Sequence, residues 1–164
     1  MIGINDYRIS IIQRLLGKNG GKPTPGGRML CKALVVRSSS RNIVMVRDFA
    51  GQLADDCGFS TNAVFAIKLA VSEALSNAIL HGSPRGSQSI VRLVFLCDKN
   101  KLRITITDEG AFGPLPRNKS TGSEGGRGLK LIARNVDTFS IQPTAFGTRV
   151  TLVKIKKTDA AACA

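Results

Sequence analysis

The sequence predicts an α+β fold, a two-layer α/β sandwich in which helices cover one face of a mixed β-sheet. The first observation is the order of the expected elements: strand, helix, helix, strand, strand, long loop, helix, strand, strand. Hairpins in this order replace the regular alternation of strand and helix that is typical of α/β proteins. The second observation is that 164 residues, 43% of them apolar, are enough for one domain with its own core.

Two expected helices follow the first strand of this domain. Residues 33–37 are mainly apolar and predict the strand, and the serines at 38–40 are typical of the cap that begins a helix. The helices are expected over 41–57, ended by Gly58, and over 60–81, ended by Gly82-Ser83-Pro84.

The second half of the chain predicts two hairpins separated by a long loop. Strands are expected over 89–97, 101–107, 138–142 and 148–156, with a short helix over 129–135. Residues 109–126 hold seven glycines and prolines, and a loop of this length inside a domain is usually functional or disordered.

The two ends of the chain differ from this regular part. Four apolar residues near the start have helical spacing and predict one short amphipathic helix: Ile9, Ile12, Leu15 and Leu16. Residues 17–27 are rich in glycine and proline, as linkers are. We therefore expect a flexible basic N-terminal extension at 1–31, the regular domain at 32–157 and a C-terminal tail at 158–164.

The charge and the cysteines narrow the class of protein. The 24 basic and 11 acidic residues give a formal net charge of +13, which favours an acidic partner such as nucleic acid, a nucleotide or an acidic protein. The four cysteines lie far apart and the chain has one histidine, so neither a zinc site nor a disulfide framework is indicated. No apolar run is long enough to span a membrane, and we expect a cytoplasmic protein.

The second expected helix carries a polar stripe. Glu73, Asn77 and His81 are spaced four residues apart, so they lie on one side of the helix, flanked by apolar residues. An ionised carboxylate among apolar side chains is costly unless it has a partner, which points to a ligand. The alternative is an ordinary polar stripe at the protein surface.

Asp108 is a second candidate. It continues the alternate row of Leu102, Ile104 and Ile106, so its carboxylate is expected to point toward the core at the end of the strand. There it needs a hydrogen-bond donor, and the exocyclic amine of a purine is suitable. The alternative is an aspartate that begins a turn before glycine.

The third candidate is the glycine-rich segment 125–128, directly before the expected helix at 129–135. Backbone N–H groups at the start of a helix bind phosphate, and Arg127 adds a fixed positive charge. Taken alone, such a segment is usually only a loop.

Taken together and in this order, the motifs Glu73-x-x-x-Asn77-x-x-x-His81, Asp108-x-Gly110, Gly126-x-Gly128 and Gly147-Thr148 resemble those of the Bergerat-fold ATPases. This superfamily includes gyrase, histidine kinases and the anti-sigma-factor serine kinases. Residues 71–78 and 126–129 are most similar to the last group. The resemblance covers about 32–157 and implies a Bergerat-type ATPase fold for this histidine-kinase-like ATPase domain.

The resemblance implies a role for each motif in binding ATP and Mg²⁺. Asn77 would bind Mg²⁺, Glu73 would be the general base, and Asp108 would accept a hydrogen bond from adenine, helped by Thr148. The expected nucleotide-binding set is completed by His81 near the helix end, Gly110 beside the base, Gly113, and the lid residues Gly126, Arg127, Gly128 and Leu129. Gly113 departs from the Asp-x-Gly-x-Gly pattern of the family because it lies one position late.

The resemblance also implies a function. The expected activity is that of a serine/threonine protein kinase that acts as an anti-sigma factor, phosphorylates an anti-sigma antagonist and sequesters a sigma factor. Family members are commonly homodimers, so a second copy of the chain is a further candidate partner. One alternative is a non-catalytic ATP-binding module that controls a protein partner. Direct nucleic-acid binding is disfavoured, since the basic residues are scattered and the chain has one Tyr and no Trp.

Overall fold

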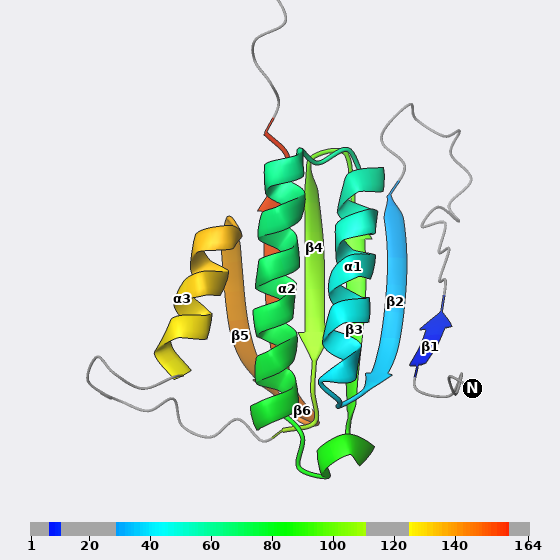
Figure 1. Cartoon of the computed structure of the whole chain (residues 1–164), viewed down its shortest axis with the longest axis vertical. Helices are drawn as coiled ribbons and strands as arrows, with labels where there is room; N and C mark the ends of the chain where they lie inside the picture. Colours follow the sequence, from blue (N-terminus) through cyan, green and yellow to red (C-terminus); the bar gives the residue numbers. More distant parts are fainter. Residues whose placement is uncertain (1–6, 11–28, 111–124, 158–164) are drawn as a thin grey trace, which may run out of the picture.

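A six-stranded β-sheet covered on one face by three α-helices makes up the described part of the computed structural model, residues 7–10, 29–110 and 125–157 (Figure 1). The elements are β1 (Tyr7–Ser10), β2 (Leu30–Arg37), α1 (Arg41–Asp56), α2 (Thr61–His81), a 3₁₀ turn (Gly86–Gln88), β3 (Ile90–Cys97), β4 (Lys101–Thr107), α3 (Gly125–Asn135), β5 (Thr138–Thr144) and β6 (Gly147–Ile155). The predicted two-layer α+β class is confirmed.

The sheet is antiparallel throughout, so the predicted mixed sheet is wrong in this respect. Its order is β1-β2-β3-β4-β6-β5, and all five neighbouring pairs are antiparallel. Two helices connect β2 to β3, and together they return the chain to the end of the sheet that it left. A single helix connects β4 to β5, which therefore run in the same direction, but β6 lies between them.

The core lies between the helices and the sheet. Alternate residues of the central strands point toward the helices, as the sequence predicted, and the largest are Leu93, Phe95, Leu102 and Ile106. Phe49 of α1 packs edge-on against Phe95 with the ring centres 5.3 Å apart. This packing holds α1 and α2 in place over the sheet.

The helix α2 is the most apolar of the three described helices. The expectation that no apolar run is long enough to span a membrane is wrong for this helix, which by length and composition alone is long and apolar enough to cross one. Figure 1 shows α2 between α1 and α3 and over the sheet, and its buried residues belong to the core. One third of its most apolar window is buried, so packing in the core accounts for one face of this helix.

The largest differences from prediction lie at three elements, and the other boundaries shift by no more than two residues. Tyr7–Ser10 forms an edge strand paired with β2 where a helix was expected to begin near Ile9, because the free edge of β2 offers backbone hydrogen bonds that a short isolated helix lacks. β2 begins at Leu30, so the expected boundary between residues 31 and 32 lies within it. α3 begins at Gly125, not near residue 129, because packing against α2 outweighs the low helix propensity of glycine. Residues 158–164 and the rest of the expected N-terminal helix lie outside the described residues.

Candidate active site

The polar stripe of α2 faces the first turn of α3. A Cβ atom placed on Gly128 would lie 3.0 Å from Glu73 Oε2 and 3.6 Å from Asn77 Nδ2. Glu73 and Asn77 are both half-buried on α2. The structure thus brings a carboxylate and an amide against the N-terminal end of α3, where the helix dipole attracts negative charge.

Asp108 lies directly after β4, with 5% of its surface exposed. Its Oδ1 accepts hydrogen bonds from the backbone N–H groups of Gly110 at 2.9 Å and Thr148 at 3.2 Å. The Thr148 hydroxyl also donates to the Gly110 carbonyl at 3.3 Å. No described residue donates a hydrogen bond to Oδ2, so this oxygen is the one suited to a ligand amine.

The environment of Asp108 sets its protonation. Burial raises the pKa of the Asp108 carboxyl above its usual range, and the hydrogen bonds from Gly110 and Thr148 act in the opposite direction. An additional donor at Oδ2 would favour the ionised carboxylate further. The residue therefore fits a ligand that brings an N–H group to this oxygen.

Three glycines allow the backbone to pass close to Asp108. A Cβ on Gly82, at the end of α2, would overlap the Asp108 carboxyl group, and a Cβ on Gly147 would overlap the Asp108 carbonyl oxygen. A Cβ on Gly110 would lie 2.5 Å from the Gly82 Cα. The resemblance implies that Gly110 makes room for the base, whereas in the structure its missing side chain makes room for Gly82.

Gly147 is the most constrained of these glycines, because its φ of 149° is also unfavourable for other residues. We expect Gly147→Ala to lower the free energy of unfolding by about 3 kcal/mol, since backbone strain adds to the overlap with Asp108. Urea unfolding followed by circular dichroism measures this. The control is Gly58→Ala, where φ is 79° and nothing lies within 4 Å of the added Cβ, so strain alone should cost about 1 kcal/mol. Equal losses in the two variants would contradict the overlap.

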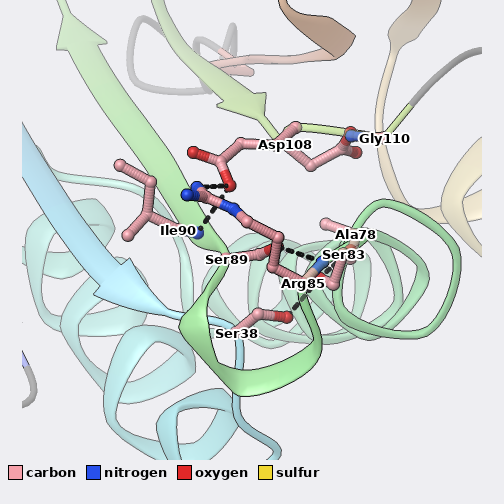
Figure 2. Close-up of polar contacts among 9 residues, drawn as sticks. Ser38, Ala78, Ser83, Arg85, Ser89, Ile90, Asp108 and Gly110 are labelled. Atoms are coloured by element: carbon pink, nitrogen blue, oxygen red, sulfur yellow. Dashed lines mark hydrogen bonds and ion pairs between the residues drawn. The ribbon is translucent and has the colours of Figure 1, made fainter.

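The loop after α2 is tied to the segment that follows Asp108. Arg85 forms an ion pair with Glu109 at 2.6 Å, and the same carboxylate oxygen accepts the backbone N–H of Ile90 at 3.3 Å. The Arg85 guanidinium holds the pKa of the Glu109 carboxyl below its usual range. Figure 2 shows Arg85 extending from this loop toward Ile90.

Serine side chains close the same loop. Ser83 Oγ donates to the Ala78 carbonyl at 3.1 Å, and the hydroxyls of Ser38 and Ser83 contact each other (Figure 2). Ser89 Oγ accepts the backbone N–H of Arg85 at 3.1 Å. Sequence patterns did not identify these supporting residues. Glu109 occupies the variable position of the motif Asp108-x-Gly110, and no sequence pattern identifies Arg85.

The other predicted site residues lie around this centre. Leu129 packs against the core, whereas Arg127 and His81 are exposed. Gly126 belongs to the first turn of α3. Gly113 lies outside the described residues, as does the expected lid from residue 111 to 124.

The donor atoms suit a magnesium ion that is shared with phosphate. Among the described residues there is no group of three or more His, Cys, Asp and Glu side chains that would enclose a metal. The Asn77 side-chain oxygen is a hard ligand of the kind Mg²⁺ accepts, and Mg²⁺ commonly takes its other ligands from phosphate and water. The site therefore fits a nucleotide-bound Mg²⁺ better than a cage made by the protein alone.

Comparison with known proteins agrees with the fold. Residues 36–154 match the family model described as histidine kinase-like ATPase domain. The chain is 31% identical to an anti-sigma F factor of Bacillus cereus over 106 residues, 59% of this chain and 73% of that protein. It is 30% identical, with the same coverage, to an anti-sigma F factor of Bacillus thuringiensis.

A solved structure shares the fold. The RsbU and RsbW domains of a Mycobacterium tuberculosis protein superpose with a TM-score of 0.56 at 20% identity, over 83% of this chain. The chain spans only 34% of that structure, so the likeness concerns the fold of one domain.

The fold and the site thus define an ATP-binding domain of the Bergerat type. The chain belongs to the histidine kinase-like ATPase family. Within it, the identity to the Bacillus proteins places the chain among the anti-sigma-factor kinases.

Proposed function

We propose that the chain is a serine/threonine protein kinase that phosphorylates an anti-sigma antagonist with ATP and sequesters a sigma factor in the bacterial cytoplasm. The observation that supports this most directly is that Glu73 and Asn77 face the first turn of α3 around Gly128. A general base and a magnesium ligand then lie where a helix N-terminus favours phosphate. The names of the Bacillus relatives support the anti-sigma role.

The adenine end of the nucleotide is assigned to Asp108. Its Oδ1 is held by Gly110 and Thr148, which leaves Oδ2 directed to the exocyclic amine. Thr148 therefore supports Asp108 through its backbone N–H and supports Gly110 through its hydroxyl. An adenine amine is a donor, so it matches this acceptor, whereas guanine presents an oxygen at the same position.

The phosphate end is assigned to the first turn of α3. Gly126 and Gly128 bring backbone N–H groups close to the phosphates, Arg127 adds positive charge, and Leu129 anchors the turn in the core. We place Gly113 with the segment that covers the nucleotide and His81 at its border. When bound, ATP supplies the γ-phosphoryl group, and Mg²⁺ held by Asn77 neutralises charge on its oxygens.

Glu73 carries the proton transfer in this proposal. The hydroxyl oxygen of the substrate serine or threonine forms a bond to the γ-phosphorus, and the bond to the ADP oxygen breaks. Glu73 accepts the hydroxyl proton as the new bond forms. Gly128 keeps the space beside Glu73 Oε2 open, since a Cβ there would lie only 3.0 Å away.

The test is phosphate transfer to a second protein. We expect the purified chain, mixed with γ-labelled ATP, Mg²⁺ and candidate anti-sigma antagonists, to place label on an antagonist serine or threonine. Omission of Mg²⁺ should abolish labelling. ATP binding without label on any antagonist would contradict the kinase proposal and favour a non-catalytic ATP-binding module. A homodimer, which the family resemblance suggests, is tested separately by sedimentation.

A further inference from the structure

The face of the sheet turned away from the helices carries unpaired arginines. Arg92 of β3 and Arg149 of β6 both pair in register with Thr107 of β4, so the three residues form one row across the sheet. Arg103 lies on the same face of β4 as Thr107, four residues earlier in the strand. All three arginines are exposed, and none forms an ion pair or hydrogen bond with another described residue.

These arginines line a broad, open depression of about 1000 Å³. Its lining contains four arginines and one acidic residue, Glu109, which gives a formal charge of +3 from +4 and −1. Glu109 is already paired with Arg85, so it does not neutralise the other three arginines. The lining thus concentrates positive charge on the side of the sheet opposite the core.

The same depression contains exposed apolar side chains. Phe146, in the turn between β5 and β6, is 87% exposed, and Val94 of β3 is 37% exposed. Arginine and aromatic residues together are typical of the residues that contribute most to protein–protein binding. A surface of this composition suits a partner that brings both carboxylates and apolar side chains.

A second copy of the chain and single-stranded nucleic acid fit this face of the sheet less well. In a symmetric dimer built on this face, two patches of net positive charge would be brought together, and like charges oppose such an interface. Single-stranded nucleic acid needs several aromatic side chains for its bases to stack on, whereas Phe146 is the one aromatic residue among the described residues of this lining. The strand positions at the centre of the face are Val94, Thr105 and Thr151. Charge complementarity therefore favours an acidic protein.

We propose that this face, defined by Arg92, Arg103, Arg149, Val94 and Phe146, is a docking surface for an acidic segment of a partner protein. Figure 1 shows α2 and α3 on one face of the sheet, and these side chains belong to the other face. The lining shares none of the residues assigned to ATP. The proposal therefore stands independently of kinase activity. It also explains part of the net charge of +13 that the nucleotide site does not use.

The test uses a fluorescein-labelled peptide of 16 residues in which glutamate, aspartate and leucine alternate. We expect the full chain to bind it with an affinity that falls as salt rises, and Arg92→Ala/Arg103→Ala/Arg149→Ala to weaken binding at least tenfold. The control Lys99→Ala/Lys130→Ala/Arg134→Ala removes the same charge from exposed residues elsewhere and should change affinity less than twofold. ATP affinity should be unchanged in both variants.

Four outcomes would overturn the proposal. Equal weakening by the control variant would mean that net charge alone attracts the peptide, and undetectable binding by the unaltered chain would exclude the surface. Tighter binding of a 16-nucleotide oligothymidine that depends on the same arginines would make the face a nucleic-acid site. A dimer that dissociates on substitution of these arginines, seen by sedimentation, would assign it to a second copy. Thermal unfolding of each variant verifies that it folds.

Discussion

Glu73→Gln is expected to lower the rate of phosphate transfer to the antagonist by about 10²–10⁴-fold, the usual contribution of a general base. The substitution preserves the size and hydrogen-bonding shape of the side chain, but the amide does not accept the hydroxyl proton. ATP affinity should stay within about threefold, because the adenine and magnesium contacts are assigned to Asp108 and Asn77. Single-turnover labelling measures the rate, and calorimetry measures ATP binding.

The control for this prediction is Asp55→Asn, which removes an exposed carboxylate from α1 outside the site. Both rates and affinities should match those of the unaltered chain. Undiminished transfer by Glu73→Gln would exclude Glu73 as the base. Loss of ATP binding together with loss of transfer would assign Glu73 to nucleotide binding instead of proton transfer.

Asp108→Asn is expected to weaken ATP binding by about 10–100-fold, measured by calorimetry with Mg²⁺ present. The asparagine oxygen can still accept the N–H groups of Gly110 and Thr148, which orients its amide nitrogen toward the adenine amine. Two donors then face each other, and the hydrogen bond is lost. Equal affinities in the two proteins would reject the nucleotide-site assignment.

The effects of Asp108 on ATP affinity and on folding stability are expected to depend on pH in opposite ways. Burial raises the pKa of Asp108, so the ionised carboxylate costs folding free energy at neutral pH. This cost disappears as pH falls through the raised folded-state pKa. The unaltered chain should therefore gain stability relative to Asp108→Asn on acidification, while its ATP affinity falls because the protonated carboxyl is a poorer acceptor.

Asp98 provides a control in which stability is expected to change with pH in the opposite direction. The backbone N–H groups of Asn100 and Lys101 both donate to its Oδ1 and help to lower the pKa of this carboxyl. Its contribution to stability is present above the unfolded-state pKa and is lost as pH falls through the folded-state pKa. Urea titrations between pH 7 and pH 3 compare Asp98→Asn and Asp108→Asn, each with the unaltered chain. A parallel change in both would contradict the effect of burial on Asp108.

The described boundaries of α2 and β4 and the orientation of Asp108 were predictable from local patterns. The alternation of apolar residues before Asp108 placed its carboxylate on the core side, and the structure shows it buried there. The four-residue spacing of Glu73 and Asn77 placed both on one side of α2. Each of these predictions concerns the geometry of a single helix or strand, so the spacing of residues within that element is enough to make it.

The contacts that hold the site together were not predictable in the same way. The crossing of Gly82 and Gly110, and the ion pair between Arg85 and Glu109, join residues more than twenty positions apart. Neither spacing nor composition identifies such pairs. They depend on where the loop after α2 meets the end of β4.

The amino-acid sequence by itself determined the α+β class, the order of the principal elements from β2 to β6 and the ATPase motif set, because these reside in local periodicity and in short motifs. Only the tertiary structure decided that every neighbouring strand pair is antiparallel, that α3 begins at Gly125 against α2, and that Arg92 and Arg149 flank Thr107 on the open face. Strand pairing and helix packing set these features through contacts between distant segments. Their free energy depends on the whole domain rather than on any one segment.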